Sequence, residues 1–171
     1  MKIKLLPASL LPATLLLVVA AIAAQPMVRA AEAAAPAAAA APAAAAKTVV
    51  IVGNDTLKFN VTKIEATPGQ AIHVQLRNEG TLPKDGMGHN WILLDSDGEA
   101  VPYAMAAISA RDVAFMPKAL ATHVLAFIPL LGPKEVGDVT FNAPTKTGKY
   151  PFICSCSGHS MSGMRGELIV K

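Results

Sequence analysis

The sequence predicts an all-β fold: a β-sandwich of about eight strands with a short helical insertion. Short β-branched and aromatic runs recur from Lys47 to the C-terminus, and Gly, Pro and Asn separate them at intervals typical of an antiparallel sandwich. One of these runs, residues 71–77, alternates between apolar and polar side chains, which is the period of a half-buried strand.

The chain begins with the pattern of an export signal. Lys2 and Lys4 precede an apolar run over residues 10–24, and small residues follow it. We expect residues 1–30 to be a signal peptide, cleaved after Ala23 or Ala24 or later, around residues 30–33. The alternative is an uncleaved N-terminal anchor, because residues 5–24 are about as long as the 20 residues that span a bilayer.

Residues 31–46 are expected to form a semi-extended linker. They contain thirteen alanines, with Pro36 and Pro42 interrupting any helix, and they offer no patterned face to bury. The folded domain is then expected over residues 47–171, at the end of a possible membrane tether.

The composition of the whole chain is dominated by its first 46 residues. Hydrophobic residues make up 53% of the chain, but residues 1–46 hold 34 of them, 20 of which are alanine. The net charge of +3 likewise falls to +1 over residues 47–171, with 12 basic and 11 acidic side chains. A near-neutral domain of this kind disfavours a polytopic membrane protein and a strongly basic nucleic-acid binder.

Seven segments of the domain are expected to be strands: residues 48–52, 71–77, 90–94, 122–128, 137–142, 148–154 and 166–170. Residues 103–121 differ from them, since alanines recur there near helical spacing. This stretch predicts a helical excursion between two strands that ends or bends at Pro117.

The candidate chemistry lies in the last predicted turn. Cys154 and Cys156 are too close in sequence for an unstrained disulfide. Cys154, His159 and Met164 lie within eleven residues, and His89 stands at the start of another predicted strand, directly before residue 90. Two imidazoles, a thiolate and a weak thioether are the ligand set of a blue-copper site, in which both copper valences are tolerated.

Residues 48–171 resemble the cupredoxin family, in particular its azurin-like and auracyanin-like members. The segments that carry the resemblance are Gly53-Asn-Asp-x-x-x-Phe-Asn60, Leu82-Pro-Lys84, Met87-Gly-His-Asn-Trp91, Asp138-Val-Thr-Phe141, Tyr150-x-Phe-x-Cys154, Gly158-His-Ser160 and Met164-x-Gly166. The resemblance implies a Greek-key β-sandwich, the cupredoxin fold, with one copper ion per domain.

The resemblance also implies a role for each site residue. Cys154, His89 and His159 would be the equatorial ligands and Met164 the axial one, with the Gly88 carbonyl as a weak fifth contact. Asn90 would hold the cysteine loop through Ser155, and Trp91 would be a core residue.

The sequence departs from the azurin pattern at three points. Four residues separate His159 from Met164 instead of three, and Met161 is too close to His159 to compete for the axial position. Cys156 replaces a bulky apolar residue; we interpret it as a packing residue, the alternative being a second thiol near copper. The strand-linking disulfide of azurin is absent, since no cysteine precedes Cys154.

The resemblance further implies that His159 comes close to the surface inside an apolar collar, formed by Leu57, Leu82, Met87, Met161, Gly158 and Gly163. For Met105 and Met116, a position in the core is as good an interpretation as a position at the docking surface. His73 is expected to be solvated, and neither it nor His123 lies in a motif.

The function implied is a one-electron carrier in the periplasm or elsewhere outside the cytoplasm. Its partners would be redox proteins such as cytochromes, copper reductases or oxidases, or a photosynthetic or respiratory complex. The alternatives are a copper enzyme, disfavoured by the small number of remaining histidines, and Cu(I) sequestration by Cys154, Cys156 and methionines.

Overall fold

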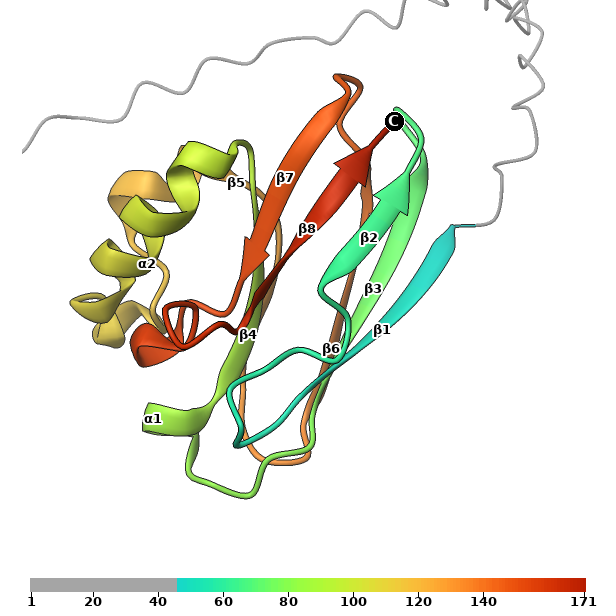
Figure 1. Cartoon of the computed structure of the whole chain (residues 1–171). Coiled ribbons are helices and arrows are strands. Elements are labelled where there is room, and N and C mark those ends of the chain that lie inside the picture. Colours follow the sequence, from blue (N-terminus) through green and yellow to red (C-terminus); the bar gives the residue numbers. More distant parts are fainter. Residues whose placement is uncertain (1–45) are drawn as a thin grey trace, which may run out of the picture. The chain divides into compact units, whose positions relative to one another are not determined.

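The computed structural model describes residues 46–171. These residues fold into two sheets with eight strands in all, together with short helices (Figure 1). The predicted signal peptide and all but the last residue of the predicted linker lie outside the described residues. The three-stranded sheet has the order β1-β3-β6, with β1 at Lys47–Gly53, β3 at Ala71–Asn78 and β6 at Val136–Asn142. The five-stranded sheet has the order β2-β8-β7-β4-β5, with β2 at Lys63–Ala66, β8 at Arg165–Val170, β7 at Gly148–Ile153, β4 at His89–Leu94 and β5 at Val124–Leu131.

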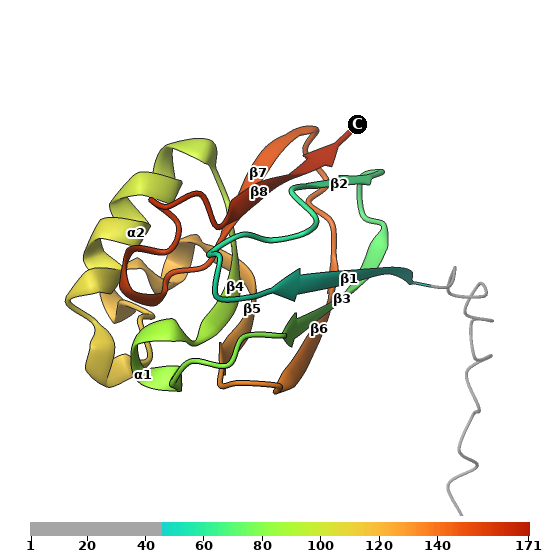
Figure 2. The same cartoon turned by 60° about the horizontal axis from the view of Figure 1, so that its bottom comes forward.

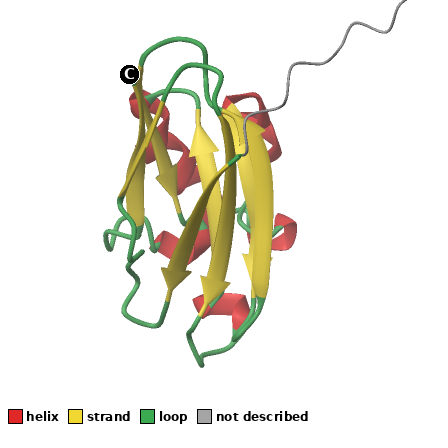
Figure 3. Cartoon of the chain, turned by 90° about the vertical axis from the view of Figure 1, so that its right-hand side faces the viewer, coloured by secondary structure: helices red, strands yellow, loops and turns green. Residues whose placement is uncertain are grey.

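The predicted β-sandwich is confirmed, but its pairing is mixed rather than purely antiparallel. β1 runs parallel to β3, and β2 runs parallel to β8. The remaining pairs, β3–β6, β4–β5, β4–β7 and β7–β8, are antiparallel. Figure 3 shows the strands as two layers with loops at both ends.

All seven expected strands are present, and none of their ends differs from the prediction by more than three residues. The eighth strand, β2, is the one that the sequence did not predict. It is only four residues long and two of them are charged, so its apolar pattern is carried by Ile64 and Ala66 alone. Parallel pairing with β8 forms this strand, and such a non-local contact leaves no local signal.

The expected helical excursion begins earlier and is more broken than residues 103–121. It consists of η1 (Asp97–Glu99), α2 (Ala100–Ile108), η2 (Arg111–Val113) and η3 (Lys118–His123), where η marks a 3₁₀ helix. Pro102 is tolerated in the first turn of α2, where a backbone N–H is not needed. Pro117 precedes η3 and does not end the main helix, which stops at Ile108.

The excursion covers the outer face of the five-stranded sheet (Figure 2). Ile92 and Leu94 of β4 and Ile153 of β7 pack there against Tyr103 and Ala104 of α2. Every residue of β4 is buried, and residues 91–94 form a continuous apolar run because both faces of the strand are covered there.

The main core lies between the two sheets. The Trp91 side chain is fully buried there, with its ring centroid 5.9 Å from that of Phe141 and 5.5 Å from that of Phe152. The prediction that Trp91 is a core residue is confirmed. Within residues 46–171, no helix is both long and apolar enough to cross a membrane.

Candidate metal centre

The topology brings the four predicted ligands to one end of the five-stranded sheet. His89 is the first residue of β4, Cys154 follows the last residue of β7, and Met164 precedes the first residue of β8. Because β7 is antiparallel to both β4 and β8, the end of β7 meets the beginnings of its two neighbours. His159 lies in the β7–β8 connection, directly after η4 (Cys156–Gly158).

Three of these side chains form a tight, buried cluster. The Cys154 sulfur lies 3.5 Å from Nδ1 of His159 and 4.0 Å from Nδ1 of His89. One donor atom from each of the three residues lies within 4.8 Å of the other two. Cys154 and His89 are fully buried and His159 is 2% exposed, so the donors are shielded from bulk water.

Met164 is held beside this cluster by its backbone and by Gly53. Its N–H donates to the carbonyl of His159 at 3.0 Å, and its carbonyl accepts from Cys154 N–H at 3.0 Å. A Cβ at position 53 would lie 2.6 Å from Met164 Cε and 3.1 Å from His89 Cδ2. A glycine at the end of β1 therefore leaves room for the Met164 thioether beside His89. The axial role of Met164 and the weak contact of the Gly88 carbonyl stay predictions.

Asn90 fixes the cysteine loop, as the resemblance implied. Its side-chain amide donates to Ser155 Oγ and its Oδ1 accepts from Ser155 N–H, both at 2.8 Å. Ser155 Oγ then donates to the carbonyl of Phe115 at 2.7 Å, which connects the loop to the helical excursion. Every group in this series of hydrogen bonds is buried, so the position of the cysteine loop does not depend on solvent.

The His159 ring is fixed by a contact that the sequence did not predict. Its Nε2 lies 3.2 Å from the carbonyl oxygen of Gly86, in the short helix α1 (Lys84–Met87). A carbonyl can only accept, so Nε2 carries the proton and the Nδ1 lone pair faces the Cys154 sulfur. This is the tautomer that a metal ligand needs.

Burial sets the protonation of all three donors. It lowers the pKa of His89 to about 4, with the nearby His159 adding to the effect and the Asn54 backbone opposing it. Burial also lowers the pKa of His159, while the Gly86 carbonyl raises it. The imidazoles are therefore neutral at pH 7 and ready to bind a metal.

The cysteine, in contrast to the imidazoles, keeps its proton at pH 7 in the metal-free protein. Burial raises the pKa of the Cys154 thiol to about 12, although N–H groups of Asn90 and Cys156 favour the thiolate. Since only the thiolate is a strong metal ligand, metal binding must release this proton.

The donor set fits copper. One soft thiolate and two imidazoles suit copper in either valence, and a buried site of fixed geometry suits a metal that remains bound. Cys156 does not belong to the cluster of donors that the described residues form. It is fully buried and packs in the main core, which favours the interpretation as a packing residue.

The two other histidines lie outside the site. His73 is half-buried on β3, with Nδ1 3.0 Å from Thr140 Oγ1. His123 is flanked by two carboxylates, with Nδ1 3.2 Å from Asp95 and Nε2 3.9 Å from Glu99. These partners come from the β4–α2 connection and were not evident from the sequence.

None of the six residues expected to form the apolar collar is buried, and their arrangement around His159 stays a prediction. Leu82 is 43% exposed and Met161 is 61% exposed, while Leu57 and Met87 are half-buried. The His159 ring itself does not reach the surface, because α1 covers its Nε2 edge. Met105 is 51% exposed, so its interpretation as a core residue is wrong; Met116 is half-buried against the second core cluster.

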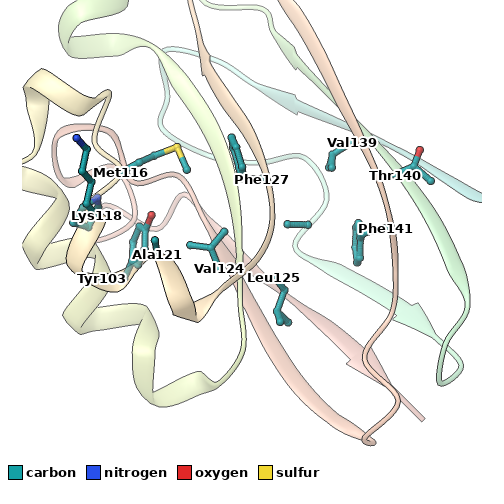
Figure 4. A pocket seen from close by; sticks show the side chains of 12 residues that line it. Tyr103, Met116, Lys118, Ala121, Val124, Leu125, Phe127, Val139, Thr140 and Phe141 are labelled. Atoms are coloured by element: carbon teal, nitrogen blue, oxygen red, sulfur yellow. The ribbon is translucent and has the colours of Figure 1, made fainter.

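A cavity of about 430 Å³ lies away from the copper ligands, where strand β5 passes between the helical excursion and β6 (Figure 4). Its lining is mainly apolar and comprises Tyr103, Met116, Pro117, Lys118, Ala121, Val124, Leu125, Ala126, Phe127, Val139, Thr140 and Phe141. None of the predicted site residues contributes to it, so the cavity plays no part in the copper site.

A two-sheet sandwich with a buried His-Cys-His cluster defines a copper protein of the blue-copper class. Residues 45–171 match the family of copper binding proteins described as the plastocyanin/azurin family. The chain belongs to this family, and His89, Cys154 and His159 form its copper site.

Individual relatives agree with this assignment. The chain is 32% identical to auracyanin-B of Chloroflexus aurantiacus over 117 residues, which is 68% of this chain but only 48% of that protein. It is 35% identical to azurin of Pseudomonas denitrificans over 130 residues, covering 72% of this chain and 98% of azurin. The structure of auracyanin A, described as a "blue" copper protein from Chloroflexus aurantiacus, aligns with a TM-score of 0.62 at 31% identity, covering 72% of this chain and 98% of that one.

Sequence reasoning missed three residues that shape the site: Gly53, Gly86 and Phe115. Gly86 and Phe115 act through backbone carbonyls, which every residue has, so their side chains give no signal. Gly53 stands in the Gly-Asn-Asp segment that carries the family resemblance, but no role at the site was assigned to it.

Proposed function

We propose that the chain is a blue-copper carrier that shuttles single electrons between redox partners outside the cytoplasm. When bound, copper supplies the Cu(II)/Cu(I) couple. The observation that carries this proposal is that Nδ1 of both histidines already faces the Cys154 sulfur, while hydrogen bonds fix the cysteine loop and the His159 ring.

A fixed site is what electron transfer needs. Asn90 holds Ser155 next to Cys154, and the Gly86 carbonyl holds His159. Cys154 and His159 therefore keep their places when the charge of the metal changes, and little reorganisation opposes the transfer. A site buried from water also protects the thiolate from other chemistry.

The proposed partners are redox proteins, such as cytochromes, copper reductases or oxidases, or a photosynthetic or respiratory complex. Docking would be apolar and brief, supported by the exposed Leu82 and Met161. A second cavity of about 430 Å³, next to α1, is lined by both signs of charge, including Lys84, Arg111, Asp85 and Asp112. With a domain charge of +1, long-range steering of a partner is weak.

We further propose that the protein is periplasmic or otherwise extracytoplasmic. The support is the signal-like pattern of residues 1–30 and the spacer-like composition of residues 31–46. Sequencing the N-terminus of the protein from its native envelope fraction distinguishes a cleaved signal from a membrane tether.

Two other functions fit the site less well. Cu(I) sequestration would use Cys156 as a further ligand, yet this thiol lies in the core and outside the donor cluster. A copper oxidase or reductase would need a second centre, and the remaining histidines, His73 and His123, are engaged with Thr140 and with Asp95 and Glu99.

The decisive experiment is a visible spectrum and a redox titration of the copper-loaded protein. A carrier shows the intense charge-transfer band of a copper thiolate and a reversible one-electron couple with one copper per chain. A colourless protein that binds several Cu(I) ions would instead support sequestration.

A further inference from the structure

The Nε2 edge of His159 does not face solvent. The residue is 2% exposed, and its Nε2 lies 3.2 Å from the Gly86 carbonyl. No residue of α1 is buried, so this single turn forms the outer layer above the imidazole. A redox partner that approaches the site from this side meets the Gly86 peptide before it meets the ring.

The turn is anchored to its surroundings. Met87 N–H donates to the Pro83 carbonyl and Gly88 N–H to the Lys84 carbonyl, both at 3.0 Å. Lys84 Nζ lies 3.2 Å from a carboxylate oxygen of Glu135. That same oxygen accepts from Gly132 N–H at 2.6 Å, which ties α1 to the β5–β6 connection.

The outer face of Gly86 is open. A Cβ placed there would meet no atom within 4 Å, and the residue does not have a positive φ. A side chain at position 86 would therefore fit without strain and would project into space that a partner could occupy. Nothing in the packing of the fold requires a glycine at this position.

We propose that electrons enter and leave through the Gly86 peptide, which is coupled to His159 by the Nε2–H···O=C hydrogen bond, and that the missing side chain allows a partner to approach closely. The proposal rests on the function proposed above. In the electron-transfer step, one electron passes from the reduced redox centre of one protein to the oxidised redox centre of the other. No bond is made or broken, and the proton stays on His159 Nε2.

The test is electron self-exchange between the Cu(I) and Cu(II) forms of the protein, measured by NMR line broadening, in the wild type and in Gly86→Leu. We expect Gly86→Leu to slow self-exchange by about tenfold or more, because a shift of about 1 Å between oriented reactants is enough to cost large factors in rate. Gly86→Ala should give a smaller loss. The visible spectrum and the potential should stay unchanged.

Gly98→Leu is the matched control. Gly98 lies in η1, and a Cβ there also meets no atom within 4 Å. It should exchange electrons at the wild-type rate. Equal rates for Gly86→Leu and Gly98→Leu would overturn the proposed exit.

A second readout does not depend on copper. In the metal-free protein, ¹⁵N NMR should show His159 protonated on Nε2 in both the wild type and Gly86→Leu, which means that the contact survives the substitution. A proton on Nδ1 would overturn the pathway. A wild-type copper protein without reversible one-electron exchange would overturn the proposed function, whereas normal wild-type exchange with an unaffected Gly86→Leu would overturn only the exit.

Discussion

Asn90 and Ser155 exchange two hydrogen bonds across 65 residues of sequence, both 2.8 Å long and both buried. One residue adjoins the ligand His89 and the other adjoins the ligand Cys154. The pair therefore ties together the ends of the two strands that supply these ligands.

The first prediction follows from this pair. Asn90→Ala should lower the free energy of unfolding of the metal-free protein by about 1–3 kcal/mol, because it leaves buried Ser155 groups without their partner. It should also shift the potential of the copper-loaded protein, since the cysteine loop loses its support. Denaturant unfolding and a redox titration measure the two effects.

Asn142→Ala is the control, because Asn142 is an exposed residue at the end of β6. If both variants unfold at the same denaturant concentration, the Asn90–Ser155 pair does not support the site.

The second prediction concerns Gly53. A Cβ there would lie 2.6 Å from Met164 Cε, so Gly53→Ala must displace the thioether. Because a flexible side-chain end can move, we expect a stability loss of only about 1 kcal/mol, at the low end for overpacking. The potential and the visible spectrum should change more clearly. Gly98→Ala, where the added methyl meets open space, should change neither.

The third prediction separates the two candidate methionines. Met164 is fully buried beside the cluster, whereas Met161 is 61% exposed. Met164→Gln offers a harder oxygen donor that favours Cu(II), so the potential should fall by more than about 60 mV, the tenfold equivalent of a one-electron couple. Met161→Gln should leave the potential in place. The reverse result would assign the axial role to Met161.

The fourth prediction tests the second cysteine. Cys156 is fully buried in the core, and burial raises the pKa of its thiol to about 11. Cys156→Ser should therefore leave the charge-transfer spectrum and the potential unchanged while lowering stability by about 1–3 kcal/mol, because a hydroxyl is buried in an apolar place. A changed spectrum would show that this thiol acts on the copper.

The sequence was sufficient for the ligands because their signals are local. Cys154, His159 and Met164 share one loop, and His89 stands in a compact motif next to Asn90 and Trp91. The strands were visible for the same reason, as short apolar runs between turns. Only β2 was not predicted, because it is defined by its pairing with β8, which is distant in sequence.

The surroundings of the site could not be predicted in the same way. The contact between Gly86 and His159 joins a backbone carbonyl to a ring 73 residues away, and the one between Ser155 and Phe115 spans 40. Such contacts are set by how the loops pack on one another, which no residue type indicates. The expectation that His159 approaches the surface was incomplete because α1 covers it.

The fifth prediction concerns the pH dependence of the metal-free protein. The pKa of His89 is about 4 in the folded state, lowered chiefly by burial, and about 6.5 in the unfolded state. Between these values the unfolded chain binds more protons, so stability falls as the pH drops from about 6.5 to about 4. For this residue alone the loss is about 3 kcal/mol, and the lowered pKa of His159 adds to it in the same direction.

Cys154 acts at the other end of the pH range. The pKa of its thiol is about 12 in the folded state, above the ordinary value of 9.0, so stability should fall again as the pH rises above about 9. Chemical unfolding of the metal-free protein between about pH 4 and about pH 10 measures both limbs; carboxylates also titrate near the acid end, in the wild type and in the variants alike. His89→Gln should flatten the acid limb, and His73→Gln is the matched control for the loss of an imidazole. An acid limb that is equally steep in His89→Gln and the wild type would contradict the assignment, because the neutral imidazole of His89 would then not be what acid titrates.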